Sequence, residues 1–246
     1  MEEEIIYGRN AVTEALLSGR AVDTVYIQKT AKGMGKIISL AKESGAVVKD
    51  VSEEKLDMLA PEGKHGGVAA KAAAAEYSSV EDILLTAKEK KEPPFIIIAD
   101  EIQDPHNLGA IIRTAEAAGA HGVIIPKRRS AGLTATVLKT SAGAASWIKV
   151  ARVSNLVDTI NSLKKQGIWV YGAEADGEPF HKADLSGPAA LVIGSEGFGL
   201  GRLVRESCDM ILSIDMYGKV NSLNASVSGG ILMYEIVRHR RTSGKA

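Results

Sequence analysis

The chain has 246 residues, of which 45% are apolar and 4% aromatic, and its 30 basic side chains balance 30 acidic ones. The single cysteine, Cys208, excludes a disulfide framework and a cysteine-rich metal site, and it fits a reducing compartment. The five histidines lack metal-ligand spacing, no apolar run approaches the roughly 18 residues of a membrane span, and the acidic start lacks a signal-peptide pattern, so we expect a soluble cytoplasmic protein without a metal.

The first 75 residues predict a small α/β domain in which short helices alternate with short apolar strands. Its helices are expected at residues 10–17, 35–44 and 53–59, and its strands at residues 24–28, 47–48 and 68–70. The sequence Tyr7-Gly8-Arg9-Asn10 is the polar group that looks placed for a purpose here, although such residues more often form a turn and a helix N-cap.

Residues 76–94 differ in composition from the segments on either side of them. Ser78-Ser79 predicts the N-cap of a helix from Val80 to about Lys90, and a charged run then ends at Pro93-Pro94. Proline stops a helix because it lacks an N–H and its ring clashes with the preceding turn. We therefore expect a linker helix here, between domains at residues 1–75 and 95–246.

From Phe95 onward, apolar strands and helices alternate. The expected strands are 95–99, 122–125, 148–151, 169–172, 190–193 and 210–214, and helices are expected near 108–118, 134–142, 156–165, 200–206 and 227–241. Continuous apolar strands that alternate with helices predict an α/β fold with a parallel sheet covered on both faces. Ligands bind beyond the carboxyl ends of the strands in such sheets, so the loops at those ends are the candidate sites.

The loop after the first of these strands leads into a helix with an isolated cation. Asn107 is a candidate N-cap for this helix, and Arg113 follows it amid isoleucine and alanine residues. An arginine on so apolar a helix either extends its charge to water or is held for a function. The loop lacks the G-x-G-x-x-G pattern, which disfavours a dinucleotide-binding fold.

The loop after the fifth strand, Gly194–Gly201, is rich in glycine and carries Ser195 and Glu196. It matches neither the G-x-S-x-G nucleophile turn nor a Walker phosphate loop. Glycines there expose backbone N–H groups and admit a ligand close to the main chain. Because Glu196 would repel phosphate, we expect a neutral or cationic ligand.

The stretch after the sixth strand, Ile214–Ser226, has more polar residues than one helix cap needs. Ser222 or Asn224 would cap the helix that follows, which leaves the remaining polar side chains without an explanation. Gly229-Gly230 then falls early in that helix, where glycine is unfavourable unless another backbone or a ligand approaches closely. Three polar loops therefore follow strand ends.

The motifs in these loops, residues 104–115, 191–199 and 222–227, resemble the three ordered motifs of the SpoU (TrmH) family of RNA 2′-O-ribose methyltransferases. The resemblance covers residues 95–241. The Tyr7-Gly8-Arg9-Asn10 start and the Gly66-Gly67-Val68 run are similar to the RNA-binding domain of the RlmB-like subgroup, which methylates a guanosine of 23S ribosomal RNA.

The resemblance implies a six-stranded, mostly parallel sheet with a C-terminal trefoil knot, S-adenosylmethionine as cofactor, and a homodimer with the site at the subunit interface. By the same resemblance, the cofactor pocket is lined by Gly194, Ile214, Met216 and Leu223. Arg113 is implied to act on the ribose 2′-hydroxyl, supported by Asn107, Glu196, Ser222 and Asn224. Asp215 and Ala225 depart from the residues usual in the family, which are Pro and Val.

The role of Arg113 and the identity of the RNA substrate each have more than one interpretation. Arg113 either accepts the proton of the 2′-hydroxyl late in the reaction or stabilises the developing alkoxide as a fixed cation. RNA contacts are expected at Arg9 and at Lys127, Arg128 and Arg129, which follow a strand end, whereas 238–241 is expected to be a solvated terminus. The competing functions are a transfer RNA 2′-O-methyltransferase and a non-catalytic RNA-binding homologue.

Overall fold

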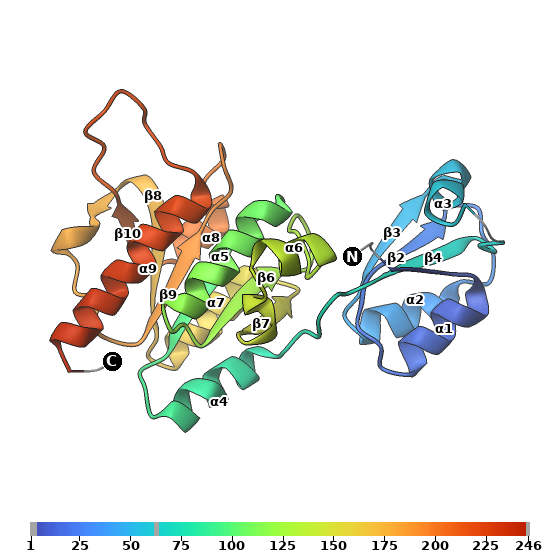
Figure 1. The fold of residues 1–246 in the computed structure, drawn as a ribbon, viewed down its shortest axis with the longest axis horizontal. Helices are drawn as coiled ribbons and strands as arrows, with labels where there is room; N and C mark the ends of the chain where they lie inside the picture. Colours follow the sequence, from blue (N-terminus) through green and yellow to red (C-terminus); the bar gives the residue numbers. More distant parts are fainter. Residues whose placement is uncertain (1–3, 62–63, 245–246) are drawn as a thin grey trace. The chain divides into compact units, whose positions relative to one another are not determined.

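The computed structural model describes residues 4–61 and 64–244, and the chain forms two compact units (Figure 1). The first unit comprises Met1–Glu76 with Gly132–Ala135, and the second comprises Tyr77–Ala131 with Thr136–Ala246.

The first unit is a four-stranded sheet with three helices. Its elements in chain order are β1 (Ile5–Tyr7), α1 (Arg9–Leu17), β2 (Val22–Gln28), α2 (Gly35–Glu43), β3 (Val47–Val51), α3 (Glu53–Leu59) and β4 (Val68–Ala72). The strand order is β1-β4-β2-β3; β4 is antiparallel to both of its neighbours, and β2 and β3 are parallel. Val12 of α1, Ile37 of α2 and Val25 of β2 belong to one buried core. The three-residue strand β1 was not anticipated, because so short a run carries no recognisable alternation.

The second unit contains the predicted six-stranded sheet. Its elements are α4 (Val80–Lys90), β5 (Phe95–Ala99), α5 (Pro105–Ala117), β6 (Gly122–Pro126), α6 (Ala135–Thr140), η1 (Ala144–Ser146), β7 (Lys149–Val153), α7 (Leu156–Lys165), β8 (Trp169–Pro179), η2 (Phe180–Lys182), β9 (Ala189–Ile193), α8 (Arg202–Ser207), β10 (Met210–Ser213) and α9 (Ala225–Thr242). The strand order is β10-β8-β9-β5-β6-β7, and each neighbouring pair is parallel. The α/β fold is therefore confirmed, with a sheet that is parallel throughout. The implied knot stays a prediction.

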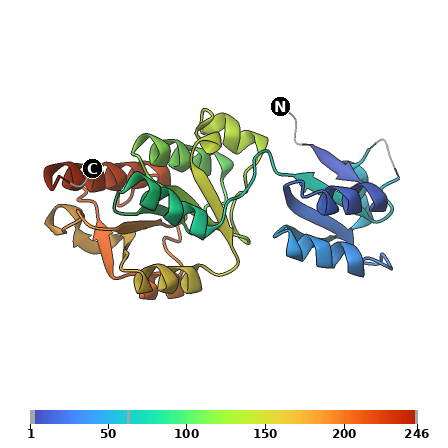
Figure 2. The same ribbon diagram turned by 90° about the horizontal axis from the view of Figure 1, so that it is seen from below.

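Helices cover both faces of this sheet. Figure 2 shows α5 and α9 on one side and α7 and α8 on the other. Ile160 of α7 and Val204 of α8 pack with Ile96 and Val192 of the central strands. On the opposite face, α9 lies so close to β9 that a Cβ added at Gly229 would come within 2.5 Å of Ile193. The Gly229 position thus meets the expectation of a close approach within the helix.

The helix α4 differs from the linker that its composition suggested. Ile83 and Ala87 are fully or almost fully buried, and Ile83 belongs to the same apolar core as the central strands. A Cβ at Gly122 of β6 would overlap the Ile83 side chain. The helix is therefore packed on the sheet, and its polar composition reflects only its outer face.

The basic run at residues 238–241 was expected to be solvated, and this is wrong for Arg240, which is only 5% exposed. Its guanidinium donates hydrogen bonds to the carbonyl oxygens of Pro93 (2.9 Å), Pro94 (2.7 Å) and Gly187 (2.9 Å). It also lies over the Phe95 ring, 5.0 Å from the centroid. The reason is helical periodicity, because Arg240 continues the buried stripe of α9.

Within the described ranges, 4–61 and 64–244, no helix is long and apolar enough to cross a membrane. Nor do they contain a group of three or more His, Cys, Asp or Glu side chains that could hold a metal ion.

Candidate active site

The carboxyl ends of β8, β9 and β10 enclose a cavity of about 980 Å³. Its walls come from the loop after β9, the loop after β10, the first turn of α9 and the outer part of β8. The lining residues are Ala173, Glu174, Ala175, Asp176, Ile193, Gly194, Ser195, Glu196, Gly197, Phe198, Gly199, Leu212, Ile214, Met216, Asn221, Ser222, Leu223, Asn224, Ala225, Ser228 and Leu232. The predicted convergence of polar loops at one edge of the sheet thus has a cavity at its centre.

The glycine-rich loop after β9 folds back on itself. Ser195 and Gly199 exchange two backbone hydrogen bonds of 3.0 Å each. Gly197 and Gly199 have φ angles of 83° and 66°, which favour glycine. A Cβ at Gly194 would overlap the Gly199 carbonyl group, so only glycine allows this closure. The main chain of the loop therefore forms one wall of the cavity.

Two carboxylates that the sequence did not single out hold the end of this loop. The Leu200 N–H donates to Glu174 Oε1 at 2.9 Å, and the Gly201 N–H donates to Asp100 Oδ2 at 2.7 Å. Burial raises the pKa of the Asp100 carboxyl, and the Gly201 N–H partly offsets this effect. Arg205 Nε donates to Glu174 Oε2 at 2.5 Å. Glu174 directly follows the β8 residues that pair with β9, so the strand-end rule could have found it.

Three side chains from the segments that follow β5, β9 and β10 meet at the cavity. Asn107 Nδ2 donates to Glu196 Oε1 at 3.0 Å, and Asn224 Nδ2 donates to the same oxygen. Asn224 Nδ2 also lies 2.9 Å from Asn107 Oδ1. Glu196 is thereby held between two amides, and the loops after β5, β9 and β10 are tied together.

The two asparagines meet the N-cap predictions differently. Asn224 is the N-cap of α9, and its Oδ1 accepts from the N–H groups of Ser226 and Val227, which confirms one of the two predicted caps. Asn107 is not a cap, because Asp104 caps α5 and Pro105 follows at the first helical position. Asn107 lies in the first turn, buried, and is free to turn its amide toward Glu196.

All four residues expected to line a cofactor pocket, Gly194, Ile214, Met216 and Leu223, line this cavity. Ser222 lines it as well. Its polar lining includes the carboxylates Glu174, Asp176 and Glu196, and among the described residues no lysine or arginine lines it. Glu174 and Asp176 are paired with Arg205, whereas Glu196 has no cationic partner among the described residues. Glu196 therefore disfavours a phosphate group and suits a ligand that carries a positive charge on an otherwise neutral body. S-adenosylmethionine, with its positively charged sulfonium and its neutral adenosine, fits this lining.

Arg113 does not line the cavity of its own chain. It is exposed on α5, and within the described part of the chain it has no hydrogen-bond or ion-pair partner. Six residues separate it from Asn107, which places the two on different faces of a helix with about 3.6 residues per turn. The structure therefore brings Asn107, Glu196 and Asn224 together and leaves Arg113 apart from them.

The residues expected to contact RNA lie in both units. Arg128 and Arg129 are exposed just beyond the carboxyl end of β6, and Lys127 is partly buried. Arg129 pairs with Glu101 at 3.0 Å. Arg9, in the first unit, donates from Nε to the Gly66 carbonyl oxygen at 2.8 Å.

Two family models match the chain. The SpoU rRNA Methylase family matches residues 94–234, and the family described as RNA 2′-O ribose methyltransferase substrate binding matches residues 5–78. A Bacillus subtilis (strain 168) protein, YacO, named for the TrmH family of tRNA/rRNA methyltransferases, is 49% identical over 247 residues, which are 99% of each chain. A Staphylococcus haemolyticus (strain JCSC1435) protein named for the same family is 46% identical over 249 residues, again 99% of each chain.

Solved structures agree with this assignment. An rRNA methyltransferase from Sinorhizobium meliloti, crystallised with bound S-adenosylmethionine, is 26% identical with a TM-score of 0.60, covering 96% of this chain and 87% of that one. The SpoU methyltransferase AviRb from Streptomyces viridochromogenes has the same fold, with a TM-score of 0.62 at 23% identity over 98% of this chain and 91% of that one. The glycine-rich loop, the carboxylate-lined cavity and the matched sequence together place the chain in the SpoU (TrmH) family of RNA methyltransferases.

Proposed function

We propose that the protein transfers a methyl group from S-adenosylmethionine to a ribose 2′-hydroxyl of RNA in the cytoplasm, and that its target is a guanosine of 23S ribosomal RNA. The observation that carries the proposal is the Asn107–Glu196–Asn224 cluster beside a cavity lined by carboxylates. The match of residues 5–78 to a substrate-binding family supports an RNA substrate. The names of the relatives include both tRNA and rRNA, so transfer RNA is the second candidate.

In this proposal the cavity holds the cofactor, which supplies a methyl group bonded to a positively charged sulfur. Gly194 and Leu223 would hold the cofactor largely through their main chain, and Ile214 and Met216 would provide apolar walls. Glu196 in the lining would favour the cationic end of the ligand. Glu196, fixed by two amides, cannot swing away, which contributes the positioning that in-line displacement requires.

Methyl transfer would join the 2′-oxygen to the methyl carbon, the carbon–sulfur electron pair would stay with the departing neutral thioether, and the hydroxyl proton would pass to solvent water. A guanidinium is charged at neutral pH, so we assign Arg113 the role of a fixed cation that stabilises the developing alkoxide. Replacing Arg113 by lysine would lose the planar fork and should lower turnover.

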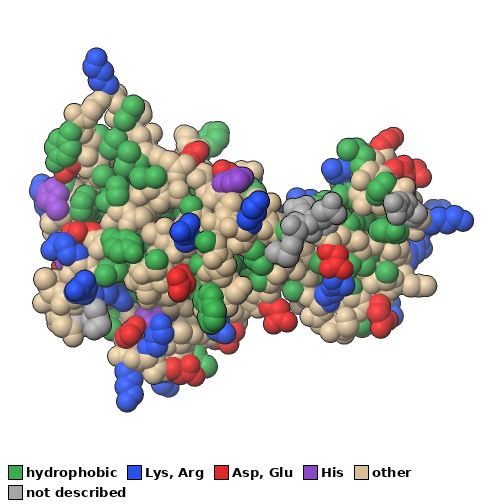
Figure 3. Space-filling view, viewed as in Figure 1, with side chains coloured by type: hydrophobic (Ala, Val, Ile, Leu, Met, Phe, Trp, Pro, Cys, Tyr) green, Lys and Arg blue, Asp and Glu red, His purple; other side chains and the backbone are tan. Residues whose placement is uncertain are grey.

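Because Arg113 lies outside the cavity of its own chain, we propose that it acts in the cavity of a second copy. The outer face of α9 carries an exposed apolar stripe of Val227, Ile231 and Tyr234, spaced four and three residues apart. Figure 3 shows hydrophobic side chains at the surface over α9. α5 packs alongside α9, so a second copy docked on this stripe would lie beside Arg113. These observations support a homodimer with a shared site.

The activity is tested with S-adenosylmethionine that carries a labelled methyl group. We expect label in 23S ribosomal RNA isolated from cells that lack the protein, at one guanosine mapped by resistance of the 2′-O-methylated linkage to alkaline cleavage. Label in transfer RNA alone would favour the second candidate. Binding of RNA without methyl transfer to either substrate would show that the protein is a non-catalytic RNA-binding homologue.

The shared site is tested by mixing two inactive variants. Arg113→Ala keeps an intact cavity, and Gly194→Ala keeps Arg113. If Arg113 acts in the partner, each mixed dimer regains one complete site, and random assortment restores about a quarter of wild-type activity. If Arg113 acts in its own chain, the mixture stays inactive.

A further inference from the structure

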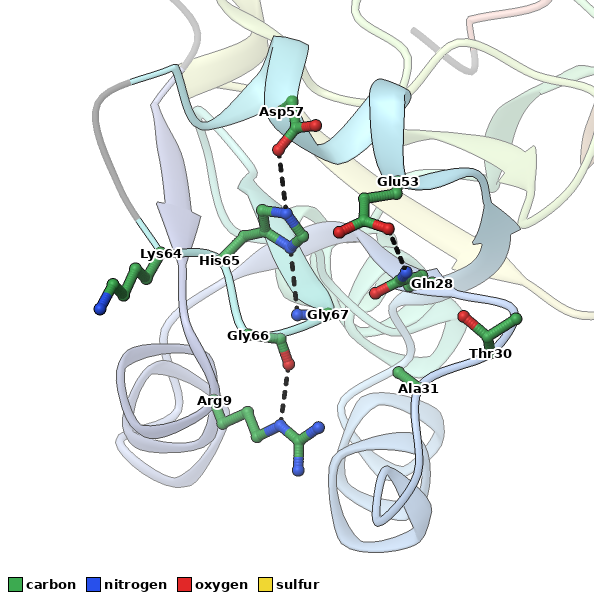
Figure 4. Close-up of a pocket in the computed structure, with 10 residues that line it drawn as sticks. All are labelled: Arg9, Gln28, Thr30, Ala31, Glu53, Asp57, Lys64, His65, Gly66 and Gly67. Carbon is green, nitrogen blue, oxygen red and sulfur yellow. Dashed lines mark hydrogen bonds and ion pairs between the residues drawn. The ribbon is translucent and has the colours of Figure 1, made fainter.

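The first unit contains a second open cavity, of about 610 Å³, which the proposed reaction does not use. Figure 4 shows its polar lining, with Glu53 and Asp57 on α3, Gln28 at the end of β2, Thr30 just after it, and the Lys64–Gly67 segment between α3 and Arg9. We propose that this cavity binds one unpaired guanosine nucleotide of the RNA substrate. The inference rests on the proposed function, because it assumes that the protein acts on RNA.

The acidic wall of the cavity is preorganised. Gln28 Nε2 donates to Glu53 Oε2 at 3.1 Å, and the Gln28 backbone N–H donates to the Gly67 carbonyl oxygen at 2.9 Å. Glu53 Oε1 has no hydrogen-bond partner among the residues that the structure describes, and a carboxylate can accept about four hydrogen bonds. The carboxylate is thus held in one orientation while most of its acceptor capacity stays available.

The floor of the cavity is held by a fixed histidine. The Gly67 N–H donates to His65 Nδ1 at 3.0 Å, so the proton of the neutral ring is on Nε2, which faces Asp57 Oδ1 at 3.1 Å. A Cβ at Gly67 would come within 2.8 Å of Ala31, and its φ of 84° also requires glycine. The turn therefore keeps one shape.

The opposite wall is cationic. Arg9 anchors its Nε on the Gly66 carbonyl oxygen at 2.8 Å and is exposed, which leaves its two terminal NH₂ groups available. A guanidinium that presents two N–H donors binds a phosphate oxygen pair well. In Figure 4 the Arg9 side chain comes from α1, on the side of the Gly66–Gly67 turn away from α3. A nucleotide between these walls would place its phosphate at Arg9 and its base at Glu53.

The donor pattern of the base follows from the lining. Guanine presents two adjacent N–H donors, N1–H and N2–H₂, on its Watson–Crick edge, which match the two oxygens of one carboxylate. Adenine, cytosine and uracil lack two adjacent donors on that edge, so one oxygen of the carboxylate would face an acceptor, which it repels. The described lining contains no Phe, Tyr or Trp ring, so recognition would depend on hydrogen bonds rather than on stacking, which tolerates any base.

The test uses the full-length chain and short RNA hairpins with one bulged nucleotide, which is guanosine, inosine, adenosine, cytidine or uridine. Inosine lacks only the N2 amino group. We expect the guanosine hairpin to bind about tenfold more tightly than the adenosine hairpin, with inosine between them. Glu53→Gln should abolish the difference between guanosine and inosine, whereas Glu14→Gln, an exposed carboxylate on α1 outside the cavity, should preserve it.

Arg9→Gln provides a second, separate readout. It should weaken the binding of all five hairpins by a similar factor and lower the slope of log Kd against log salt by about 1, without changing the base preference. Chemical shifts of the Gly67 amide on addition of guanosine monophosphate, with S-adenosylmethionine saturating the other cavity, locate the ligand. Equal binding of all five hairpins by the wild-type chain, or an unchanged guanosine preference in Glu53→Gln, would overturn the inference.

Methyl transfer separates this inference from the proposed function. If both hold, Glu53→Gln raises the RNA concentration needed for half-maximal rate and leaves turnover at saturating RNA unchanged. If the wild-type chain discriminates guanosine but transfers no methyl group, the guanosine site is supported and the proposed activity is refuted. If the chain methylates RNA but Glu53→Gln does not change RNA affinity, the activity is supported and the guanosine site is refuted.

Discussion

Asn107 and Glu196 are 89 residues apart in the chain, yet the Asn107 amide donates to the Glu196 carboxylate at 3.0 Å. Asn224 donates to the same oxygen from a third loop. One carboxylate oxygen thus fixes the relative positions of the segments after three different strands. Its removal should therefore affect the assembled site more than the fold.

Glu196→Ala should leave the two amides without their shared acceptor and lower turnover by about 10- to 100-fold, since a hydrogen bond to a charged group contributes about 1.5–3 kcal/mol. Glu196→Gln retains an oxygen and should have a smaller effect. Turnover at saturating cofactor and the thermal midpoint measure the two consequences. Glu206→Ala, on the exposed side of α8, is the matched control. Wild-type turnover in Glu196→Ala would contradict the assigned role.

Gly194→Ala should abolish cofactor binding while the protein stays folded. The new Cβ would overlap the Gly199 carbonyl group and force the loop open, and this loop forms a wall of the cavity. Gly218→Ala is the control, because a Cβ there meets nothing within 4 Å. Calorimetric titration with S-adenosylmethionine should give no heat for the first variant and a wild-type Kd for the second. Equal affinities of the two variants for S-adenosylmethionine would show that the glycine-rich loop is not part of the cofactor site.

Arg128→Gln should weaken RNA binding and leave cofactor affinity unchanged. Arg128 is exposed at the same edge of the sheet as the cavity, where it can contact a phosphate. Loss of one phosphate contact should lower the slope of log Kd against log salt by about 1. Lys165→Gln, at the end of α7 that leads into the start of β8, should not change the slope. An unchanged slope in Arg128→Gln would exclude a phosphate contact.

Protonation of His121 should destabilise the second unit in mild acid. The Phe95 N–H donates to His121 Nδ1 at 2.9 Å, so Nε2 carries the proton of the neutral ring and faces Glu92 at 3.1 Å. Burial lowers the pKa of His121, while Glu92 acts in the opposite direction. A lowered pKa in the folded state means that stability is fully present above the unfolded pKa of about 6.5 and is lost as the pH falls through the folded value.

Urea unfolding measured from pH 8 to pH 5 should therefore show a decline in stability that begins near the unfolded pKa. His121→Asn can keep an acceptor for the Phe95 N–H and should remove this component of the decline, although it lowers stability at pH 8. A wild-type chain and a variant with parallel pH profiles would contradict the assignment to His121.

Arg240→Met should lower the free energy of unfolding by about 2–4 kcal/mol, because three backbone carbonyls would lose their donors. Arg241→Met, one residue further on and exposed, should change it by less than about 0.5 kcal/mol. Denaturant midpoints at constant slope measure both changes. Similar denaturant midpoints for the two variants would mean that the hydrogen bonds of Arg240 do not stabilise the fold.

Particular residues show what the sequence could and could not predict. The strands of the second unit were visible as continuous apolar runs, and the rule about strand ends led from them to the loops that line the cavity. Asn224 could be predicted as a cap because a short polar side chain preceded an apolar helix. Asn107 met the same description, but Asp104 followed by Pro105 forms the stronger start, which left Asn107 inside the helix.

The remaining differences depend on contacts between elements that are distant in the chain. The burial of Ile83 requires the surface of β6, and the burial of Arg240 requires the carbonyls of Pro93 and Pro94, more than 140 residues earlier. The position of Arg113 depends on how α5 is rotated relative to a cavity made by other strands. Local periodicity contains no information about such long-range partners.

The tie between Arg240 and the Pro93-Pro94 carbonyls has a consequence for synthesis of the chain. The helix α9 follows every strand of the sheet in the chain and is therefore synthesised after them, and it supplies Ala225, Ser228 and Leu232 to the cavity wall. A nascent chain that has completed every strand of the sheet still lacks this wall and the contact that anchors it. Cofactor capture therefore requires that α9 has been synthesised, and a chain truncated before α9 has no complete cavity.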